Sequence, residues 1–397
     1  MHSTEKELSL ASNYGATNYK PLPVVLTKGS GIWVEDADGK HYMDMLAAYS
    51  SLNHGHCHPR IIGALKEQAD KITITSRAFH NDRMGLFLEK LCGMTGFEKA
   101  LLMNTGAEAV ETALKAARKW GKLKRGIENG QIIACKDNFH GRTISVVSFS
   151  SEPQYRDGFG PFTPGFKLAK YGDIASMEKL INDKTVAVIL EPIQGEAGVI
   201  VPPAGYLQAV RKLCDKHNIL MILDEVQTGF GRTGKLFAFD HEGIRPDVLV
   251  VGKALGGGVY PVSAMLSNND VMEVFRPGDH GSTFGGNPLG AAVGFAALEV
   301  LEDEKLVARS EELGAYFMSK LKTIRSSKIK EIRGKGLMIG LEIKKSAGPA
   351  RPLCEKLMEL GLLCKETHVQ TIRFTPPLVI TKDELDKAFE IIKSVIK

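Results

Sequence analysis

Two residues that end apolar runs have the side chains needed for Schiff-base chemistry. Asp224 ends the run ILMILD, and Lys253 ends the run VLVVGK. Such runs are typical of buried strands in a parallel sheet, and ligands bind beyond the carboxyl ends of these strands. A lysine kept neutral by its surroundings can react with an aldehyde, and a carboxylate can keep a pyridine nitrogen protonated. The pair fits pyridoxal phosphate, whereas Lys253 taken alone could equally be a surface lysine at a strand end.

The same cofactor needs a binding site for its phosphate. The segment MNTGAEAVETALKAA places Thr105, Gly106 and Ala107 between a short strand and a helix. Free backbone N–H groups and the helix dipole favour an anion at such a position. Thr-Gly before a helix is also an ordinary helix cap, which is the commoner explanation of this motif alone. The segment HGSTFGGNPLG adds the hydroxyl groups of Ser282 and Thr283 and is ambiguous in the same way.

Aromatic and charged residues in three other segments could bind a ring and a carboxylate. In DNFHGRT, Phe139 could stack on a flat heteroaromatic ring and Arg142 could hold a carboxylate through two hydrogen bonds. The alternative for that segment is a turn with an exposed arginine. EPIQGEAGV puts Glu196 in a loop, and TIRFTPPL puts Arg373 among apolar neighbours, where a guanidinium needs an anionic partner.

Three histidines in the segment NHGHCHPR raise the question of a metal site. His54, His56 and His58 stand at alternate positions, which on a strand would bring three imidazoles to one face. Asn-His-Gly and His-Pro are turn signals, and no acidic residue is close by in the sequence, so we expect no metal. Six cysteines without a CxxC pair predict neither a disulfide framework nor a zinc ribbon and suit a reducing compartment.

Strand-like and helix-like segments alternate through most of the chain. Strands are predicted for ALLMN, QIIACK, ISVVSFS, VAVILEP, ILMILDE and DVLVVGK, and helices for GAEAVETALKAARKW and YLQAVRKLCDKHN. This order favours an α/β fold with a mostly parallel, doubly wound sheet. We expect three parts: an N-terminal segment of short strands, 1–45, that belongs to a small domain; a large domain, 46–286; and a C-terminal α+β part of the small domain, 287–397.

The composition is that of an ordinary globular protein. The chain has 397 residues, of which 43% are hydrophobic and 24% charged, with a net charge of +5. The densest basic segment, KWGKLKRG, is better explained as a solvated helix end than as a nucleic-acid contact. The start MHSTEKELSL lacks a signal-peptide core, and no later segment approaches ~18 consecutive apolar residues. We expect no nucleic-acid partner, no membrane insertion and a cytoplasmic location.

Six motifs in a fixed order resemble the class III aminotransferases, which are fold-type I enzymes that use pyridoxal phosphate. The motifs are NTGAEA, FHGRT, EPIQGEAG, LDEVQTGFGRTG, GKALGGG and GSTFGGNPL, and the likeness runs from about Tyr19 to the terminal helix. The resemblance implies a large domain with a mostly parallel doubly wound sheet and a smaller α+β domain. It also implies a homodimer with both sites at the interface.

The resemblance also implies roles for the cofactor-binding residues. Lys253 would form the Schiff base and move the proton between the substrate and cofactor carbons, and Asp224 would pair with the pyridine nitrogen. Five further residues would contact the cofactor.

Phe139 would stack on the ring, and Gln227 would form a hydrogen bond to the ring hydroxyl. Gly106 and Ala107 would donate backbone N–H groups to the phosphate, and Thr283 would bring a hydroxyl to it from the partner subunit.

Two tyrosines make the sequence most similar to the family members that act on L-ornithine. They are Tyr19 in NYKPLPVVL and Tyr49 in AAYSSLNHGHCHP. The resemblance implies that both seat ornithine, whose α-carboxylate Arg142 and Tyr19 would hold so that the δ-amine is presented. Arg373 would bind the α-carboxylate of 2-oxoglutarate, and Glu196 would cover Arg373 during the ornithine half-reaction. The products would be glutamate and glutamate 5-semialdehyde, which cyclises to pyrroline-5-carboxylate.

Three other functions share such a scaffold. Enzymes for N-acetylornithine or 4-aminobutyrate keep the cofactor residues but usually differ at the position of Tyr49. A racemase or aminomutase would keep Lys253 but need no oxo acid. A regulator that senses pyridoxal phosphate would need a DNA-binding module, and we expect the segment before Tyr19 to be too short for one.

Overall fold

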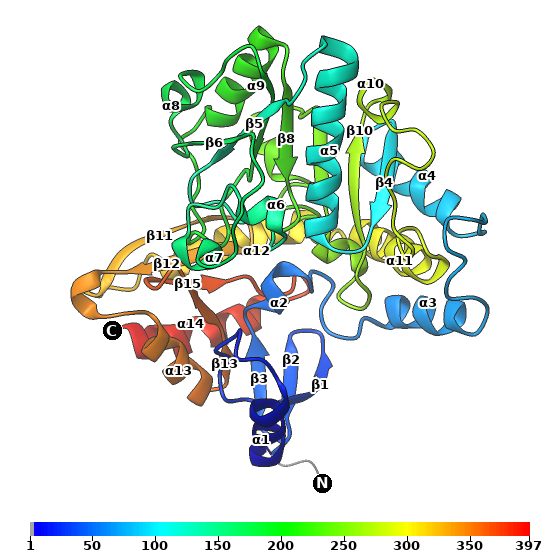
Figure 1. Ribbon diagram of the computed structural model, residues 1–397. Helices are drawn as coiled ribbons and strands as arrows, with labels where there is room; N and C mark the ends of the chain where they lie inside the picture. Colours follow the sequence, from blue (N-terminus) through cyan, green and yellow to red (C-terminus); the bar gives the residue numbers. More distant parts are fainter. Residues whose placement is uncertain (1–3) are drawn as a thin grey trace.

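A seven-stranded sheet forms the centre of the protein, whose computed structural model describes residues 4–397. The sheet lies in the upper part of Figure 1 and has the order β4-β10-β9-β8-β7-β5-β6. The five strands from β9 to β6 pair in parallel, whereas β10 is antiparallel to both of its neighbours. The prediction of a mostly parallel sheet is confirmed. The strands are β4 (Lys99–Met103), β5 (Gln131–Cys135), β6 (Phe166–Ala169), β7 (Thr185–Leu190), β8 (Leu220–Asp224), β9 (Val248–Val251) and β10 (Ser263–Ser267).

Helices cover both faces of this sheet because successive residues of a strand point to opposite sides. In β8, Ile222 packs in the apolar cluster of α5 (Gly106–Arg125), whereas Leu223 packs in the cluster that includes α9 (Tyr206–His217). Strands β7, β8 and β9 are buried along their whole length, which explains why their sequences are continuous apolar runs. The predicted doubly wound arrangement is confirmed.

Two four-stranded sheets lie below the large sheet in Figure 1. One is antiparallel, with the order β11-β12-β15-β14, and α12 packs against β11 and β12. The other has the order β1-β2-β3-β13, in which β13 from the C-terminal part pairs in parallel with β3. The strands are β1 (Leu26–Ser30), β2 (Trp33–Asp36), β3 (His41–Asp44), β11 (Ile329–Lys335), β12 (Met338–Ile343), β13 (Leu362–Leu363), β14 (Lys365–Thr367) and β15 (Thr371–Phe374).

The pairing of β3 with β13 supports the assignment of the N-terminal strands to the same domain as the C-terminal part. The domain boundaries after residues 45 and 286 stay a prediction. The other helices are α1 (Thr4–Tyr14), α2 (Ala47–Ser50), α3 (Pro59–Ala69), α4 (Met84–Thr95), α6 (Ile144–Val147), α7 (Pro153–Arg156), α8 (Ile174–Glu178), η1 (Ala238–Glu242), η2 (Lys253–Gly256), α10 (Asn269–Met272), α11 (Pro288–Asp303), α12 (Leu306–Leu321), η3 (Lys345–Ala347), α13 (Arg351–Glu359) and α14 (Lys382–Ile396).

The prediction of a strand for ISVVSFS is wrong. Residues Ile144–Val147 form the short helix α6, because the Thr143 hydroxyl accepts a hydrogen bond from the Val146 N–H and caps it. Its β-branched apolar residues had suggested a strand. Helix α1 was not predicted, and it has no buried residue, so its sequence lacks the apolar face that marks a helix.

The three histidines of NHGHCHPR each have a separate partner. The Nε2 atom of His54 lies 2.9 Å from the Ala297 carbonyl oxygen, whereas those of His56 and His58 contact the carboxylates of Asp44 and Glu304. Among residues 4–397, no group of three or more His, Cys, Asp or Glu side chains could hold a metal ion. All six cysteines are free. In the same described part of the chain, no helix is both long and apolar enough to cross a bilayer.

Candidate active site

One pocket lies where strands β8 and β9 end. Asp224 is the last residue of β8 and pairs with Val250 of the neighbouring parallel strand, so Lys253, just beyond β9, lies on the same edge of the sheet. The start of α5 and the loops after β5 and β7 complete the walls. Seven of the predicted residues line this pocket: Gly106, Ala107, Phe139, Glu196, Asp224, Gln227 and Lys253.

Lys253 is held in a conformation that few lysines adopt. Its φ of +45° lies in the left-handed region, and strain of this kind is concentrated at functional sites. Removal from bulk water lowers the pKa of its ammonium group, against the opposing effect of the Glu196 and Asp224 carboxylates. A lowered pKa increases the fraction of Lys253 in the neutral amine form, which is the form that attacks an aldehyde.

Asp224 is buried and fixed by a histidine. Its Oδ2 atom lies 2.7 Å from Nδ1 of His140, and its Oδ1 atom accepts a hydrogen bond from the Val226 N–H at 3.0 Å. Burial acts to lower the pKa of His140, but the hydrogen bond and charge of Asp224, with the charge of Glu191, raise it overall. The raised pKa favours a protonated His140, which places a positive charge beside the Asp224 carboxylate. His140 belongs to the FHGRT motif, but no sequence pattern predicted its contact with Asp224, which is 84 positions away.

The start of α5 lines another part of the pocket. Thr105 caps this helix: its hydroxyl accepts from the Glu108 N–H, and the Glu108 carboxylate accepts from the Thr105 N–H. The cap explanation of Thr105 is thus correct, and it leaves the N–H groups of Gly106 and Ala107 in the first turn for an anion. A Cβ atom on Gly106 would lie 2.9 Å from Val226, so only glycine allows this close packing.

These features fit pyridoxal phosphate. The lining offers a desolvated amine for the aldehyde, a buried carboxylate paired with His140 for the pyridine nitrogen and a helix N-terminus for the phosphate. Phe139 supplies an aromatic ring in the same lining. The four groups come from segments that are far apart in the sequence and meet only at this edge of the sheet.

Glu196 and Arg373 form an ion pair beside the pocket. Nη1 of Arg373, a buried residue of β15, lies 2.6 Å from a carboxylate oxygen of Glu196. Burial alone would raise the pKa of Glu196, but the charge and hydrogen bond of Arg373 hold it at about 2. Gln227 bridges the pair, because its amide donates to Glu196 at 3.2 Å and accepts from Arg373 at 3.4 Å. The predicted anionic partner of Arg373 is therefore present.

Arg142 lies against aromatic rings. Its guanidinium carbon is 3.9 Å from the ring centre of Tyr155 and 5.5 Å from that of Phe139. The side chain is exposed, as the turn explanation of FHGRT required, but cation–π contacts hold it near the pocket. Tyr155 was missed, since no sequence motif marks a residue that acts through a ring contact.

The two predicted substrate tyrosines lie on either side of a lysine. The Lys365 ammonium donates to the Tyr49 hydroxyl at 3.3 Å and lies 6.0 Å from the ring centre of the exposed Tyr19. The Tyr49 ring is 5.3 Å from the Arg373 guanidinium carbon. Thr283 is exposed and does not line the pocket of its own chain. Lys365 was missed because its position in β14 carries no motif.

Tyr49 also lies in a strained segment. The four residues of α2, from Ala47 to Ser50, all have φ between +46° and +72°. Left-handed conformations cost roughly 1–2 kcal/mol per non-glycine residue, so the surrounding packing must hold this turn. Strain of this kind is concentrated at functional sites, and here it lies next to Arg373. No sequence pattern predicted it.

The buried Glu191 allows a prediction of how stability depends on pH. Burial raises the pKa of its carboxyl group to about 7, although the N–H groups of Phe139 and Gly195 donate to it. The folded state therefore binds this proton more tightly than the unfolded state, so the stabilisation is complete below about pH 4.5 and is lost as the pH rises to about 7.

Over that range we expect the wild-type protein to lose about 1–3 kcal/mol of unfolding free energy that Glu191→Gln does not lose. Urea unfolding of the cofactor-free proteins at several pH values measures this difference. Parallel pH profiles for the two proteins would contradict the expected protonation of Glu191.

Comparisons with known proteins agree with this geometry. The family model for aminotransferase class-III matches residues 14–396. The chain is 59% identical to the ornithine aminotransferase of Brevibacillus brevis, over 100% of this chain and 99% of that protein. A solved ornithine aminotransferase of Toxoplasma gondii, with pyridoxal phosphate at partial occupancy in its active site, has a TM-score of 0.98 at 46% identity, covering 99% of this chain and 94% of that one.

A solved acetylornithine aminotransferase of Elizabethkingia anophelis is also similar, with a TM-score of 0.90 and 47% identity over 100% of this chain and 99% of that one. The cofactor pocket, the doubly wound sheet and the match along nearly the whole chain lead to the same assignment. The protein has the fold of the fold-type I enzymes that use pyridoxal phosphate, and it belongs to the class-III aminotransferase family.

Proposed function

We propose that this protein is an ornithine δ-aminotransferase, which transfers the δ-amino group of L-ornithine to 2-oxoglutarate. The observation that carries the proposal is the ion pair of Glu196 with Arg373 beside the Lys253 pocket. Ornithine presents an amine that is remote from its carboxylate, whereas 2-oxoglutarate presents an oxo group next to a carboxylate. Arg373 can serve both substrates if Glu196 pairs with it for the first and turns away from it for the second.

In the first half-reaction the covered Arg373 directs how ornithine binds. Because Glu196 neutralises Arg373, the α-carboxylate of ornithine would have its cationic partner in Arg142, which lies against the Tyr155 ring. Tyr19, whose ring is 6.0 Å from Lys365, would add its hydroxyl to this carboxylate. The δ-amine at the far end of the substrate then reaches Lys253. Tyr49, between Lys365 and Arg373, limits how the substrate chain lies.

In the second half-reaction Arg373 must be free. The oxo group of 2-oxoglutarate stands next to a carboxylate, which Arg373 binds once Glu196 turns away. Gln227, which contacts both side chains, can keep a hydrogen bond to either of them during this change. The low pKa of Glu196 means that ordinary changes of pH do not break the pair, so the substrate carboxylate must compete for Arg373 directly.

Other pocket residues would transfer the proton and hold the cofactor. Pyridoxal phosphate, when bound, supplies the aldehyde and an electron sink for the pair left on the substrate carbon. The neutral amine of Lys253 accepts the proton from that carbon and returns it. Asp224, paired with His140, would keep the pyridine nitrogen protonated. The remaining contacts would come from Phe139 at the ring face, Gln227 at the ring hydroxyl, and Gly106 and Ala107 at the phosphate.

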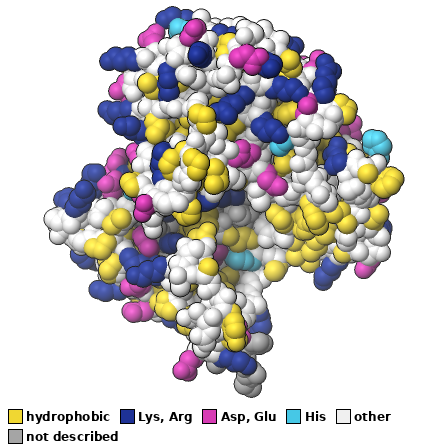
Figure 2. Space-filling view, in the orientation of Figure 1, with side chains coloured by type: hydrophobic (Ala, Val, Ile, Leu, Met, Phe, Trp, Pro, Cys, Tyr) yellow, Lys and Arg dark blue, Asp and Glu magenta, His cyan; other side chains and the backbone are white. Residues whose placement is uncertain are grey.

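We further propose a cytoplasmic homodimer with both sites at its interface, in which Thr283 reaches the phosphate of the partner's site. Thr283 and Phe284 are exposed side by side, and hydrophobic side chains gather over the region of α11 in Figure 2. Such a patch is typical of a protein interface. The reaction would serve arginine degradation and proline biosynthesis. Helices α3 and α4 both pack on α11. The exposed large apolar side chains of the loop between α3 and α4, of α4 itself and of the loop before α11 are Ile72, Phe79, Leu86 and Phe284.

Steady-state assays test the proposed function. With 2-oxoglutarate present, ornithine should give a pyrroline product with a kcat/KM at least about 100-fold above that for N-acetylornithine or 4-aminobutyrate. Turnover without any oxo acid would indicate an isomerase. A preference for N-acetylornithine or 4-aminobutyrate would move the protein to that sister activity.

Replacing Tyr49 should change which amine is preferred. Tyr49→Ile removes the hydroxyl that accepts from Lys365 and the ring beside Arg373. We expect the kcat/KM ratio of ornithine to 4-aminobutyrate to fall by roughly tenfold to 100-fold, as for the loss of one or two polar substrate contacts. Tyr14→Ile, at a tyrosine that is 86% exposed, is the matched control. An unchanged ratio in Tyr49→Ile would remove Tyr49 from substrate selection.

A further inference from the structure

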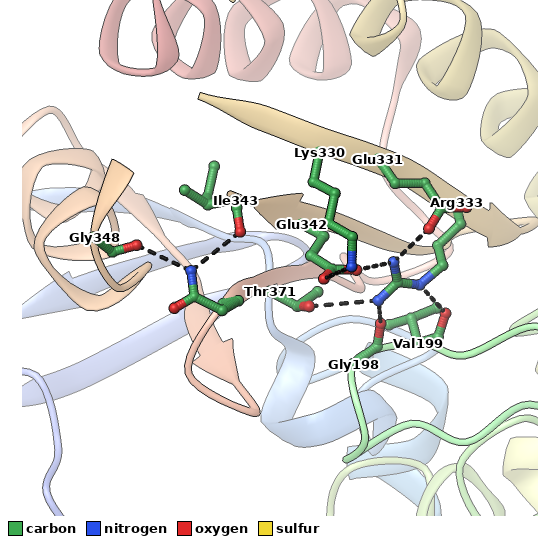
Figure 3. A network of polar contacts seen from close by, with 10 residues as sticks. Gly198, Val199, Lys330, Glu331, Arg333, Glu342, Ile343, Gly348 and Thr371 are labelled. Carbon is green, nitrogen blue, oxygen red and sulfur yellow. Dashed lines mark hydrogen bonds and ion pairs between the residues drawn. The ribbon is translucent and has the colours of Figure 1, made fainter. Parts of the chain in front are cut away.

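The turn that carries Glu196 is held by an arginine outside the pocket. Figure 3 shows Arg333 of β11 reaching across the sheet to this turn. Its Nη2 atom donates to the Gly198 carbonyl oxygen at 2.7 Å, and its Nε atom donates to the Val199 carbonyl oxygen at 3.0 Å. One guanidinium therefore fixes two successive carbonyl groups of the turn that follows Glu196.

Acidic residues hold Arg333 in this orientation. Its Nη1 atom contacts the carboxylates of Glu331 and Glu342, and only 11% of its side chain is exposed (Figure 3). Lys330 pairs with the other oxygen of Glu342, but it is 60% exposed and its ammonium group faces Glu342 rather than the turn. Arg333 is thus the member of the network that links the sheet to the Glu196 turn.

The turn itself needs such support. Gly198 has a φ of +113°, and a Cβ atom there would lie 2.9 Å from the Thr371 hydroxyl. Val199 follows with a φ of +56°, which is strained for a β-branched residue, although its side chain is fully buried. Strained backbone persists only where its surroundings hold it, and here Arg333 binds the carbonyl groups of both residues.

The same sheet also holds Arg373. The Glu196 carbonyl oxygen accepts a hydrogen bond from the Thr367 hydroxyl of β14 at 2.5 Å, and Arg373 lies on the adjacent β15. The segment from Glu196 to Val199 is therefore attached at its start through Thr367 and at its end through Arg333. This double attachment sets the Glu196 carboxylate opposite the Arg373 guanidinium.

We propose that Arg333 is a positioning residue that determines how firmly Glu196 covers Arg373, and thereby how strongly the enzyme prefers a distal amine over an α-amine. This inference rests on the proposed function. Without Arg333 the turn would sample other conformations, and Glu196 would cover Arg373 for a smaller fraction of the time. Ornithine would then bind more often by its α-carboxylate to Arg373, with the wrong amine presented, whereas glutamate would find Arg373 open.

The test compares two half-reactions of the cofactor-loaded enzyme. In Arg333→Met we expect kcat/KM for ornithine to fall and kcat/KM for glutamate to stay or rise, so that their ratio drops by about tenfold. Arg333→Lys keeps the charge near Glu342 but cannot reach both carbonyl groups, and it should change the ratio in the same direction. Arg333→Lys also provides the measurement if Arg333→Met does not fold. Lys330→Met, which removes the other cation from Glu342, should leave the ratio unchanged.

Two further measurements separate positioning from general damage. In a Glu196→Gln background the Arg333 substitution should have little additional effect on the ratio, because the two changes act on one contact. Hydrogen exchange should show faster exchange for residues 195–199 in Arg333→Met than in the wild type. Equal losses with both substrates, or an unchanged ratio despite a loosened turn, would overturn the inference.

A failure of the proposed function can be told apart from a failure of the inference about Arg333. If the wild-type enzyme prefers another amine that is remote from a carboxylate, the proposed function fails, and the ratio is measured with that amine instead. A drop in the ratio still supports the role of Arg333. If the enzyme uses ornithine but the kcat/KM ratio does not drop in the Arg333 variants, only the inference about Arg333 is contradicted.

Discussion

Lys253→Ala is expected to lower turnover with ornithine and 2-oxoglutarate by at least about 10⁴-fold. Lys253 is both the amine that would bind the cofactor covalently and the base that would move the substrate proton, so no neighbouring group can replace both roles. It is the only lysine in the pocket lining within residues 4–397. The visible absorbance of the lysine-bound cofactor should disappear as well.

Two controls show that this loss is chemical. Lys216→Ala removes a lysine that is 64% exposed and paired with Glu178 on the surface, and it should keep full activity. Thermal unfolding of cofactor-free Lys253→Ala should give a transition close to that of the wild type, because burial disfavours the charged form of this lysine in the folded protein. Retained turnover in Lys253→Ala would remove this residue from the mechanism.

Asp224→Ala is expected to lower kcat by about 10²- to 10⁴-fold and to weaken cofactor binding. The substitution removes the carboxylate that would face the pyridine nitrogen and leaves His140 buried without its partner. Asp224→Asn keeps the shape of the side chain but not its charge. We expect it to lose nearly as much kcat as Asp224→Ala, because the charge keeps the nitrogen protonated.

The adjacent Glu225 is a matched control for Asp224. Glu225 is fully buried, but its carboxylate accepts from the Thr228 hydroxyl and from the N–H groups of Ala238 and Phe239, away from the pocket. Glu225→Gln should lower the melting temperature while kcat stays within about threefold of the wild type. An unchanged kcat in Asp224→Asn, measured at saturating cofactor, would contradict the electron-sink role of Asp224.

The sequence predicted the parts of the site that depend on local patterns. Asp224 and Lys253 were found because the apolar runs of β8 and β9 end at them, and parallel neighbouring strands bring such ends together. The start of α5 was expected at the site for a similar reason, since a strand followed by Thr-Gly and a strong helix places free N–H groups at one point, and Gly106 and Ala107 do line the pocket. Their role at the phosphate stays a prediction. The site residues and their roles otherwise came from ordered motifs rather than from geometry.

The residues that the sequence missed act through contacts between distant segments. His140 meets Asp224 across 84 positions, and Arg333 meets Gly198 across 135 positions. Lys365 and Tyr155 contact other predicted residues through single side chains and belong to no motif. The strand prediction for ISVVSFS was wrong because apolar β-branched residues also fit a short capped helix. Such contacts and caps depend on the folded chain around them.

The most direct test of the account is a single half-reaction with ornithine labelled with ¹⁵N at the δ position. The cofactor-loaded wild-type enzyme is mixed with this substrate without any oxo acid, and the cofactor is then released and analysed by mass spectrometry. The account predicts loss of the visible absorbance band, ¹⁵N in the released cofactor and a pyrroline product that keeps the unlabelled α-nitrogen. Unlabelled nitrogen in the cofactor, or no spectral change with ornithine, would contradict the proposed δ-amine transfer.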